Sequence, residues 1–106
     1  MATKDRRYEL HEKLCDVLGS RNVYFQPPST IKMKYPCIVY HTDVGRAYGA
    51  DNTSTYIFTD SYMVTVIDAD PDSQIPDRLM RAFPMIRKSG PYRADNLNHY
   101  PHTLYY

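Results

Sequence analysis

The chain contains no tryptophan, two cysteines and no long hydrophobic run. Two cysteines are too few for a disulfide framework, so Cys15 and Cys37 are predicted to be free thiols that behave as small core residues. No apolar stretch approaches the ~20 residues of a membrane-spanning helix, and the first residues lack the apolar segment of a signal peptide. We therefore expect a protein that is made in the cytoplasm and has no membrane partner.

Neither sign of charge is in excess, with 13 Lys and Arg against 12 Asp and Glu. A balanced charge creates no whole-molecule field that would draw the chain to nucleic acid or to an anionic membrane. The basic residues are scattered among aromatic ones. Solvated faces and interfacial ion pairs explain them as well as a phosphate-contacting stripe does.

The motifs of common enzymes are also absent. The sequence has no phosphate-cradling glycine loop, nucleophile elbow or Ser-His-Asp pattern. Asp68, Asp70 and Asp72 alternate like the start of a calcium loop, but Ser73 and Leu79 stand where that loop needs glycine and glutamate. A turn with carboxylates at the start of a helix is the better interpretation. We predict no catalytic, cofactor or metal site, and no enzyme activity.

The histidines do not form a ligand set either. His99 and His102 are three residues apart in a predicted strand, where they point to opposite faces. No cysteine is near enough in sequence to suggest a zinc site with them. We interpret the histidines as solvated or hydrogen-bonded residues.

Tyrosine is the residue that the chain has in surplus, with 11 copies. Tyrosine suits half-buried strand faces and protein interfaces, because a rigid apolar ring carries a polar tip. A domain of 106 residues cannot easily place so many rings in its own core. The candidates for a subunit or partner interface are Tyr24, Tyr48, Tyr56, Arg78, Arg81, Tyr105 and Tyr106.

The strongest structural pattern runs from Tyr62 to Phe83. Residues 62–67 are β-branched and aromatic with apolar residues on both faces, which predicts a central strand covered on both sides. An acidic turn at residues 68–73 follows. Ile75, Leu79 and Phe83 then mark one face of a helix that is entered near Pro76 and ended by Pro84.

The other elements complete a single domain over residues 1–106. We predict a first helix at residues 4–18 capped by Gly19, strands at 23–25 and 37–40, and a long mobile loop at about 43–55, with Val44 to Asn52 as its core. A hairpin ends the chain, with a turn at 95–98 and a strand at 99–106 that is either paired inside the sheet or a free edge. The predicted class is α+β in the order α-β-β-β-α-β-β, with a mainly antiparallel sheet of about four to five strands and two helices on one face.

Several phrases of the sequence, in this order, resemble one family. Residues 19–28 (GSRNVYFQPP), 33–40 (MKYPCIVY), 64–68 (VTVID), 70–73 (DPDS) and 94–99 (ADNLNH) are similar to the tail terminator, or tail completion, proteins of long-tailed phages and prophages. The likeness spans about residues 8–106 and is weakest between residues 44 and 61. No single phrase indicates chemistry, so the resemblance depends on the whole series.

The resemblance implies a virion protein of the head–tail joining neck. In that family a homo-hexameric ring caps the head-proximal end of the tail tube, ends its polymerisation and meets the head connector. It implies contacts with the major tail tube protein and a head–tail connector or head-closure protein, with DNA passing through the lumen without specific binding. Two alternatives remain open: a head-closure or adaptor ring, and a small metal-dependent enzyme or RNA-binding module that uses the acidic turn or the basic strand residues.

Overall fold

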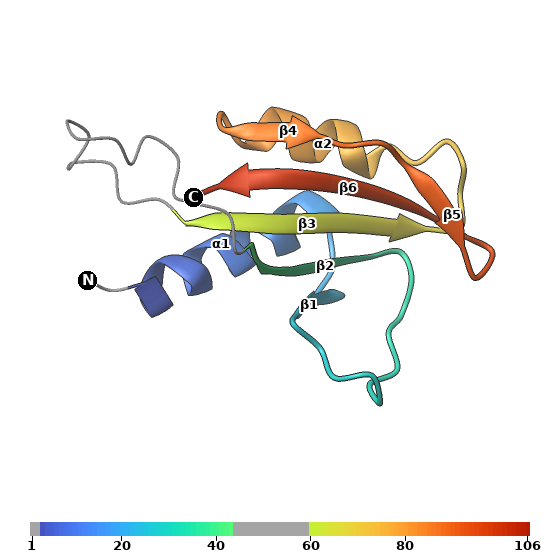
Figure 1. Cartoon of the computed structure of the whole chain (residues 1–106), viewed down its shortest axis with the longest axis horizontal. Helices are drawn as coiled ribbons and strands as arrows, with labels where there is room; N and C mark the ends of the chain where they lie inside the picture. The colour runs from blue at the N-terminus through green and yellow to red at the C-terminus, as the bar shows by residue number, and fades with distance from the viewer. Residues whose placement is uncertain (1–2, 44–59) are drawn as a thin grey trace.

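The computed structural model describes residues 3–43 and 60–106, and these form one sheet with both helices behind it (Figure 1). The strand order is β1-β2-β3-β6-β4, with β5 paired to β6 as well. Only β1 and β2 pair in parallel. The elements are α1 (Thr3–Leu18), β1 (Val23–Phe25), β2 (Cys37–Thr42), β3 (Ser61–Asp68), α2 (Ile75–Ala82), β4 (Ile86–Lys88), β5 (Tyr92–Ala94) and β6 (Leu97–Tyr105). This confirms the predicted α+β class and order, to which the structure adds the short strand β4.

Strand β3 is the central strand, as predicted, because it pairs with β2 on one side and β6 on the other. Its residues Tyr62, Val64 and Val66 are buried in one core cluster together with residues of both helices. The prediction that both of its faces are largely covered is confirmed in part. Both helices pack on the same side of the sheet; on the other side Ser61 and Ile67 are buried, whereas Met63 and Thr65 are half-exposed.

Helix α1 packs on the sheet through Leu10, Leu14 and Leu18, which recur every four residues and are all buried. Gly19 ends the helix as predicted. Its φ of 86° lies in the left-handed region, and its N–H donates to the carbonyl of Cys15 at 2.8 Å. This single bond from the residue after the helix is the αL form of the C-cap.

Helix α2 also follows the predicted pattern, with Ile75 and Leu79 buried and a proline in its first turn. The acidic turn before it lies at the start of the helix, as predicted, and the Oγ atom of Ser73 accepts a hydrogen bond from the N–H of Ile75 at 3.3 Å. The carboxylates of Asp68 and Asp70 accept hydrogen bonds from the N–H groups of Asp70 and Asp72, so they fix the turn rather than cap the helix. The N-cap residue is Gln74, whose side chain makes no capping bond.

The chain ends in a hairpin whose final strand lies inside the sheet. Strands β5 and β6 are joined by Asp95 and Asn96 alone, with φ values of 53° and 62°. Two consecutive left-handed residues form a type I′ turn, which matches the twist of the strands. The turn is therefore shorter than the predicted 95–98, because Leu97 and Asn98 already belong to β6. Of the two alternatives for this strand, pairing inside the sheet is confirmed.

Both cysteines are free and buried, as predicted. Burial raises the pKa of Cys15, and it raises the pKa of Cys37 to about 12. At neutral pH both thiols are therefore protonated. Within residues 3–43 and 60–106, neither helix has the length and apolar composition needed to cross a bilayer. The predicted loop at 43–55 lies, apart from Asp43, outside the described residues.

Candidate interaction surfaces

The side of the sheet opposite the helices, here called the open face, carries no formal charge on its three long strands. Strand alternation and the register of β2, β3 and β6 define it. On β2, β3 and β6 none of its residues is Asp, Glu, Lys or Arg, and the nearest cation on this side is Arg87 of the neighbouring strand β4. The open-face residues of the three long strands are Cys37, Val39, His41, Ser61, Met63, Thr65, Ile67, Leu97, His99, Pro101, Thr103 and Tyr105.

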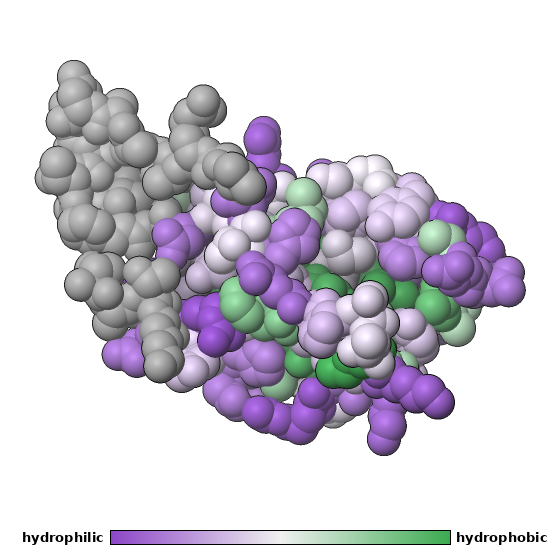
Figure 2. Space-filling model, turned by 60° about the horizontal axis from the view of Figure 1, so that its bottom comes forward, coloured by the Kyte–Doolittle hydropathy of each residue, from purple (hydrophilic) through white to green (hydrophobic). Residues whose placement is uncertain are grey.

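Most of the open face is half-buried rather than fully exposed. Val39, Met63, Thr65, Pro101 and Thr103 all have intermediate exposure. Figure 2 brings the β1 edge of the molecule forward, and hydrophobic residues lie there among hydrophilic ones. The uncharged, partly exposed side chains of the open face can pack against another protein. They offer no ion pair to a charged ligand.

Two of the predicted interface tyrosines lie on this side of the sheet. Tyr24 on β1 is in register with Val39, and its hydroxyl accepts a hydrogen bond from the backbone N–H of Lys34 at 3.0 Å. Tyr105 on β6 is in register with Ser61. The two tyrosines are thus separated by β2 and β3, so they occupy different parts of the same surface.

Tyr106 has a structural role on the helix side. Its hydroxyl donates to the Oε2 atom of Glu9 at 2.6 Å, and the cations of Arg6 and Lys13 lie 5.1 Å from its ring centroid. Its ring meets that of Phe83 edge-on at 6.0 Å. These contacts join the end of the chain to α1 and to the residue that follows α2.

The other predicted interface residues do not join the tyrosines. Arg78 and Arg81 are exposed on α2, on the helix side of the sheet. Tyr48 and Tyr56 lie outside the described residues. The structure therefore divides the predicted set between two surfaces.

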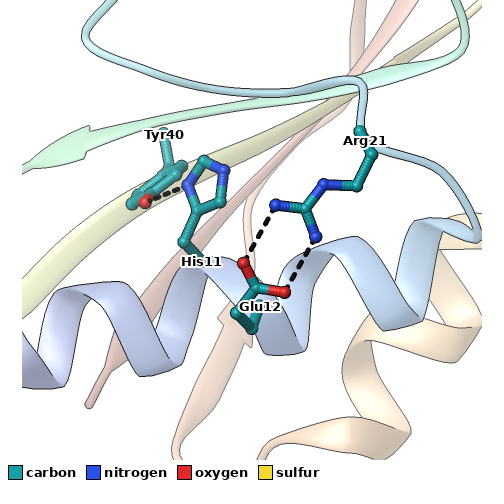
Figure 3. A network of polar contacts seen from close by, with 4 residues as sticks. All are labelled: His11, Glu12, Arg21 and Tyr40. Atoms are coloured by element: carbon teal, nitrogen blue, oxygen red, sulfur yellow. Dashed lines mark hydrogen bonds and ion pairs between the residues drawn. The ribbon is translucent and has the colours of Figure 1, made fainter.

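A cluster of rings and one arginine anchors α1 to the sheet. The Arg7 guanidinium lies 4.1 Å from the ring centroid of Phe25 and 4.7 Å from that of Tyr8. Arg7 also donates to the Tyr40 hydroxyl, which lies 2.7 Å from Nδ1 of His11 (Figure 3). Burial raises the pKa of Tyr40 and lowers that of His11. Both are therefore neutral at pH 7, and a single hydrogen bond joins the hydroxyl to the ring nitrogen.

An exposed ion pair lies next to this cluster. Glu12 on α1 accepts two hydrogen bonds from the Arg21 guanidinium, at 2.8 and 2.9 Å (Figure 3). The pair holds the segment after α1 against the helix. Water screens an exposed pair of this kind, so its contribution is mainly orientation.

His102 is the functional candidate that sequence reasoning missed. It is fully buried on the helix side, in register with Val64, and neither ring nitrogen has a hydrogen-bond partner in the described part of the chain. Burial lowers its pKa, and the nearby backbone of Val64 and Tyr100 acts in the opposite direction. Histidines of this kind are predicted from the sequence to be mostly solvated or hydrogen-bonded, and that prediction does not anticipate that this ring is buried. Its alternation with the buried Leu104 was the available signal.

His99 lies on the face of the sheet opposite that of His102, as predicted from the alternation of side chains along a strand. Its ring stacks on that of Tyr92, with centroids 4.7 Å apart and an interplanar angle of 12°. Its Nε2 atom lies 3.3 Å from the carbonyl oxygen of Ala94. The two histidines therefore share no site.

The outer edge of the sheet is basic. Arg87 and Lys88 on β4 are exposed, as are Arg78 and Arg81 on the neighbouring helix α2. These four residues, here called the basic edge, have no ion pair within the described ranges. A hollow of about 390 Å³ adjoins them, and its lining residues are Pro84, Met85, Ile86, Arg87 and Tyr105.

The acidic turn does not form a metal centre with its neighbours. Across residues 3–43 and 60–106, no group of three or more His, Cys, Asp or Glu side chains is arranged to hold an ion. The carboxylates of Asp68 and Asp70 already accept backbone N–H groups. This leaves the surfaces, rather than a pocket with reactive groups, as the best-defined candidates.

Comparisons with known protein families, curated proteins and solved structures found no match to this chain.

Proposed function

We propose that this chain is a structural virion protein of the tail terminator kind. Copies of it assemble as a hexameric ring at the head-proximal end of a phage tail tube. The ring ends tube polymerisation and joins the tail to the head connector. Its partners are further copies of itself, the major tail tube protein and a head–tail connector or head-closure protein.

The observation that carries this proposal is that the open face has no formal charge on its three long strands, β2, β3 and β6. In a ring whose sheets point inward, this face lines the lumen through which DNA passes. Specific and non-specific affinity for DNA both depend on Lys and Arg neutralising phosphates. A lumen of methyl groups and hydroxyls, such as those of Val39, Thr65 and Thr103, lets the polymer pass without holding it.

A closed ring of identical copies also needs two different patches that fit each other. Tyr24 and Tyr105 offer apolar rings with polar tips at separate places on the sheet. Tyrosine is enriched at the centres of protein interfaces. Arg78 and Arg81, on the helix side, are available to a partner outside the ring.

Native mass spectrometry of the purified chain, with and without isolated tail tubes, tests the proposal. We expect a hexamer, at the latest when tubes are added. Gold labelling in electron micrographs of whole particles then gives the position of the ring. A label on the head side of the joint favours the head-closure or adaptor ring, and a monomer under both conditions contradicts any ring.

A further inference from the structure

Strand β4 pairs with β6 on one side, and on its other side no strand of the described residues pairs with it. Tyr105 donates its N–H to the carbonyl of Met85 at 3.0 Å, and Ser89 donates its N–H to the carbonyl of Pro101 at 2.9 Å. In an antiparallel pair the bonded residues alternate. The N–H and C=O groups of Ile86 and Lys88 therefore point away from β6, and no described residue bonds to them.

Cations lie on both sides of this free edge. The register places Lys88 on the helix side, where Arg78 and Arg81 are exposed on α2, and places Arg87 on the open-face side. The sole acidic residue between Ile75 and Arg93 is Asp77. A strand that paired with this edge would therefore lie beside cations of this chain on both faces of the sheet.

The hollow beside Met85 and Tyr105 supplies an apolar contact at the same edge. Its lining combines Pro84, Met85 and Ile86 with the guanidinium of Arg87. Side-chain pockets next to an exposed edge give specificity to strand addition, while the backbone bonds give affinity. The three features therefore select for an extended segment that is acidic and carries an apolar side chain.

We propose that the β4 edge binds an extended acidic segment of another protein by strand addition. The inference goes beyond the ring and does not depend on it. Basic residues on an exposed edge can also act only as a guard, because like charges keep two such edges apart. An edge that serves only to prevent self-association has no affinity for an acidic strand. Measuring whether an acidic peptide binds therefore distinguishes the two roles.

The test uses a short peptide of alternating glutamate and valine, with a lysine–valine peptide of equal length as its control. We expect the acidic peptide to bind the full chain and the lysine peptide not to bind. In two-dimensional NMR spectra, the amide signals of Ile86 and Lys88 should shift more than those of Arg87. Equal binding of both peptides, or no shift at Ile86 and Lys88, would overturn the proposal.

Two substitutions at one position separate charge from backbone. Lys88→Ala removes the cation alone and should weaken the acidic peptide about threefold, as for an exposed ion pair. Lys88→Pro also removes the outward N–H, which β6 does not use, and should weaken binding by about another fivefold, the loss of one net hydrogen bond. Lys32→Ala, at an exposed lysine elsewhere, should leave affinity unchanged.

Two further outcomes count against the proposal. If Lys88→Pro and Lys88→Ala weaken the peptide equally, while spectra show both variants folded, the edge attracts charge without pairing a strand. If short single-stranded DNA binds and the acidic peptide does not, the basic edge binds phosphate groups, and the proposed protein partner is wrong.

Discussion

At the scale of single residues, His102 couples protonation to folding. Its ring is fully buried without a hydrogen-bond partner in the described structure, and burial lowers its pKa from the ordinary value of 6.5. Below pH 6.5 the unfolded chain binds a proton that the folded chain excludes. The free energy of unfolding therefore falls as the pH drops, by up to about 1.4 kcal/mol per pH unit for one such group.

We expect His102→Leu to flatten this pH dependence between pH 7.5 and 5, because leucine cannot titrate and fits an apolar site. Urea unfolding at several pH values measures it. His11 also has a lowered pKa, so the difference between variant and parent is the relevant quantity. Equal slopes for the variant and the parent would show that His102 is protonated in the fold.

At the scale of elements, the end of α1 depends on a left-handed residue. Gly19 has φ +86° and open space around its missing side chain, so Gly19→Ala meets backbone strain rather than a clash. We expect a loss of about 1 kcal/mol in the free energy of unfolding. Gly90→Ala is the control, because Gly90 has equal space and no positive φ. If thermal melts show equal effects at both glycines, the C-cap is not what holds this helix end.

The elements that sequence predicted best are those with long patterns. The β-branched run of β3 and the four-residue spacing of Ile75, Leu79 and Phe83 each contain enough residues to identify the element and its buried side. Strand β4 was missed because it is only three residues long, too short for a recognisable pattern, and lies in the segment between Pro84 and Gly90. Its identity depends on pairing with β6, which is distant in the chain, and local sequence does not encode that pairing.

The surfaces were less predictable than the core, for a similar reason. Apolar residues on both faces of β3 suggested two covering layers, but which side the helices cover is settled by tertiary packing. Likewise, Tyr24 and Tyr105 share a face only through the register of four strands. The basic edge forms because β4 and α2 are neighbours at the rim of the sheet. Residue types indicated an interface, and topology set its location.

At the scale of the whole molecule, the last residues are part of the core. Leu104 is fully buried, and Tyr106 exchanges backbone hydrogen bonds with Asp60 at 3.0 and 3.3 Å. We expect deletion of residues 103–106 to abolish cooperative unfolding in circular dichroism, because loss of one buried leucine alone costs about 2–5 kcal/mol. Tyr106→Phe, which removes the hydroxyl that contacts Glu9 and Lys13 but keeps the ring, should cost about 1 kcal/mol. A truncated chain that melts like the parent would contradict this.

The proposed ring gives a prediction for the open face. Thr65 is half-exposed at the middle of β3, so Thr65→Lys should fold normally while adding a cation to each copy. If this face lines the lumen, the variant should stay hexameric and gain salt-sensitive affinity for DNA, measured by filter binding at two salt concentrations. Thr65→Ser is the control. Loss of the hexamer in the lysine variant would instead make the open face a contact between copies.

The position of β6 also has a consequence for synthesis on the ribosome. Strand β6 lies between β3 and β4 in the sheet but follows both of them in the chain, so neither can gain this neighbour before β6 has been synthesised. The pairing of β3 with β6 joins residues far apart in the chain, and such contacts form slowly. Until β6 has paired, the exposed flanks of β3 and β4 are open to chaperones or to a neighbouring nascent chain.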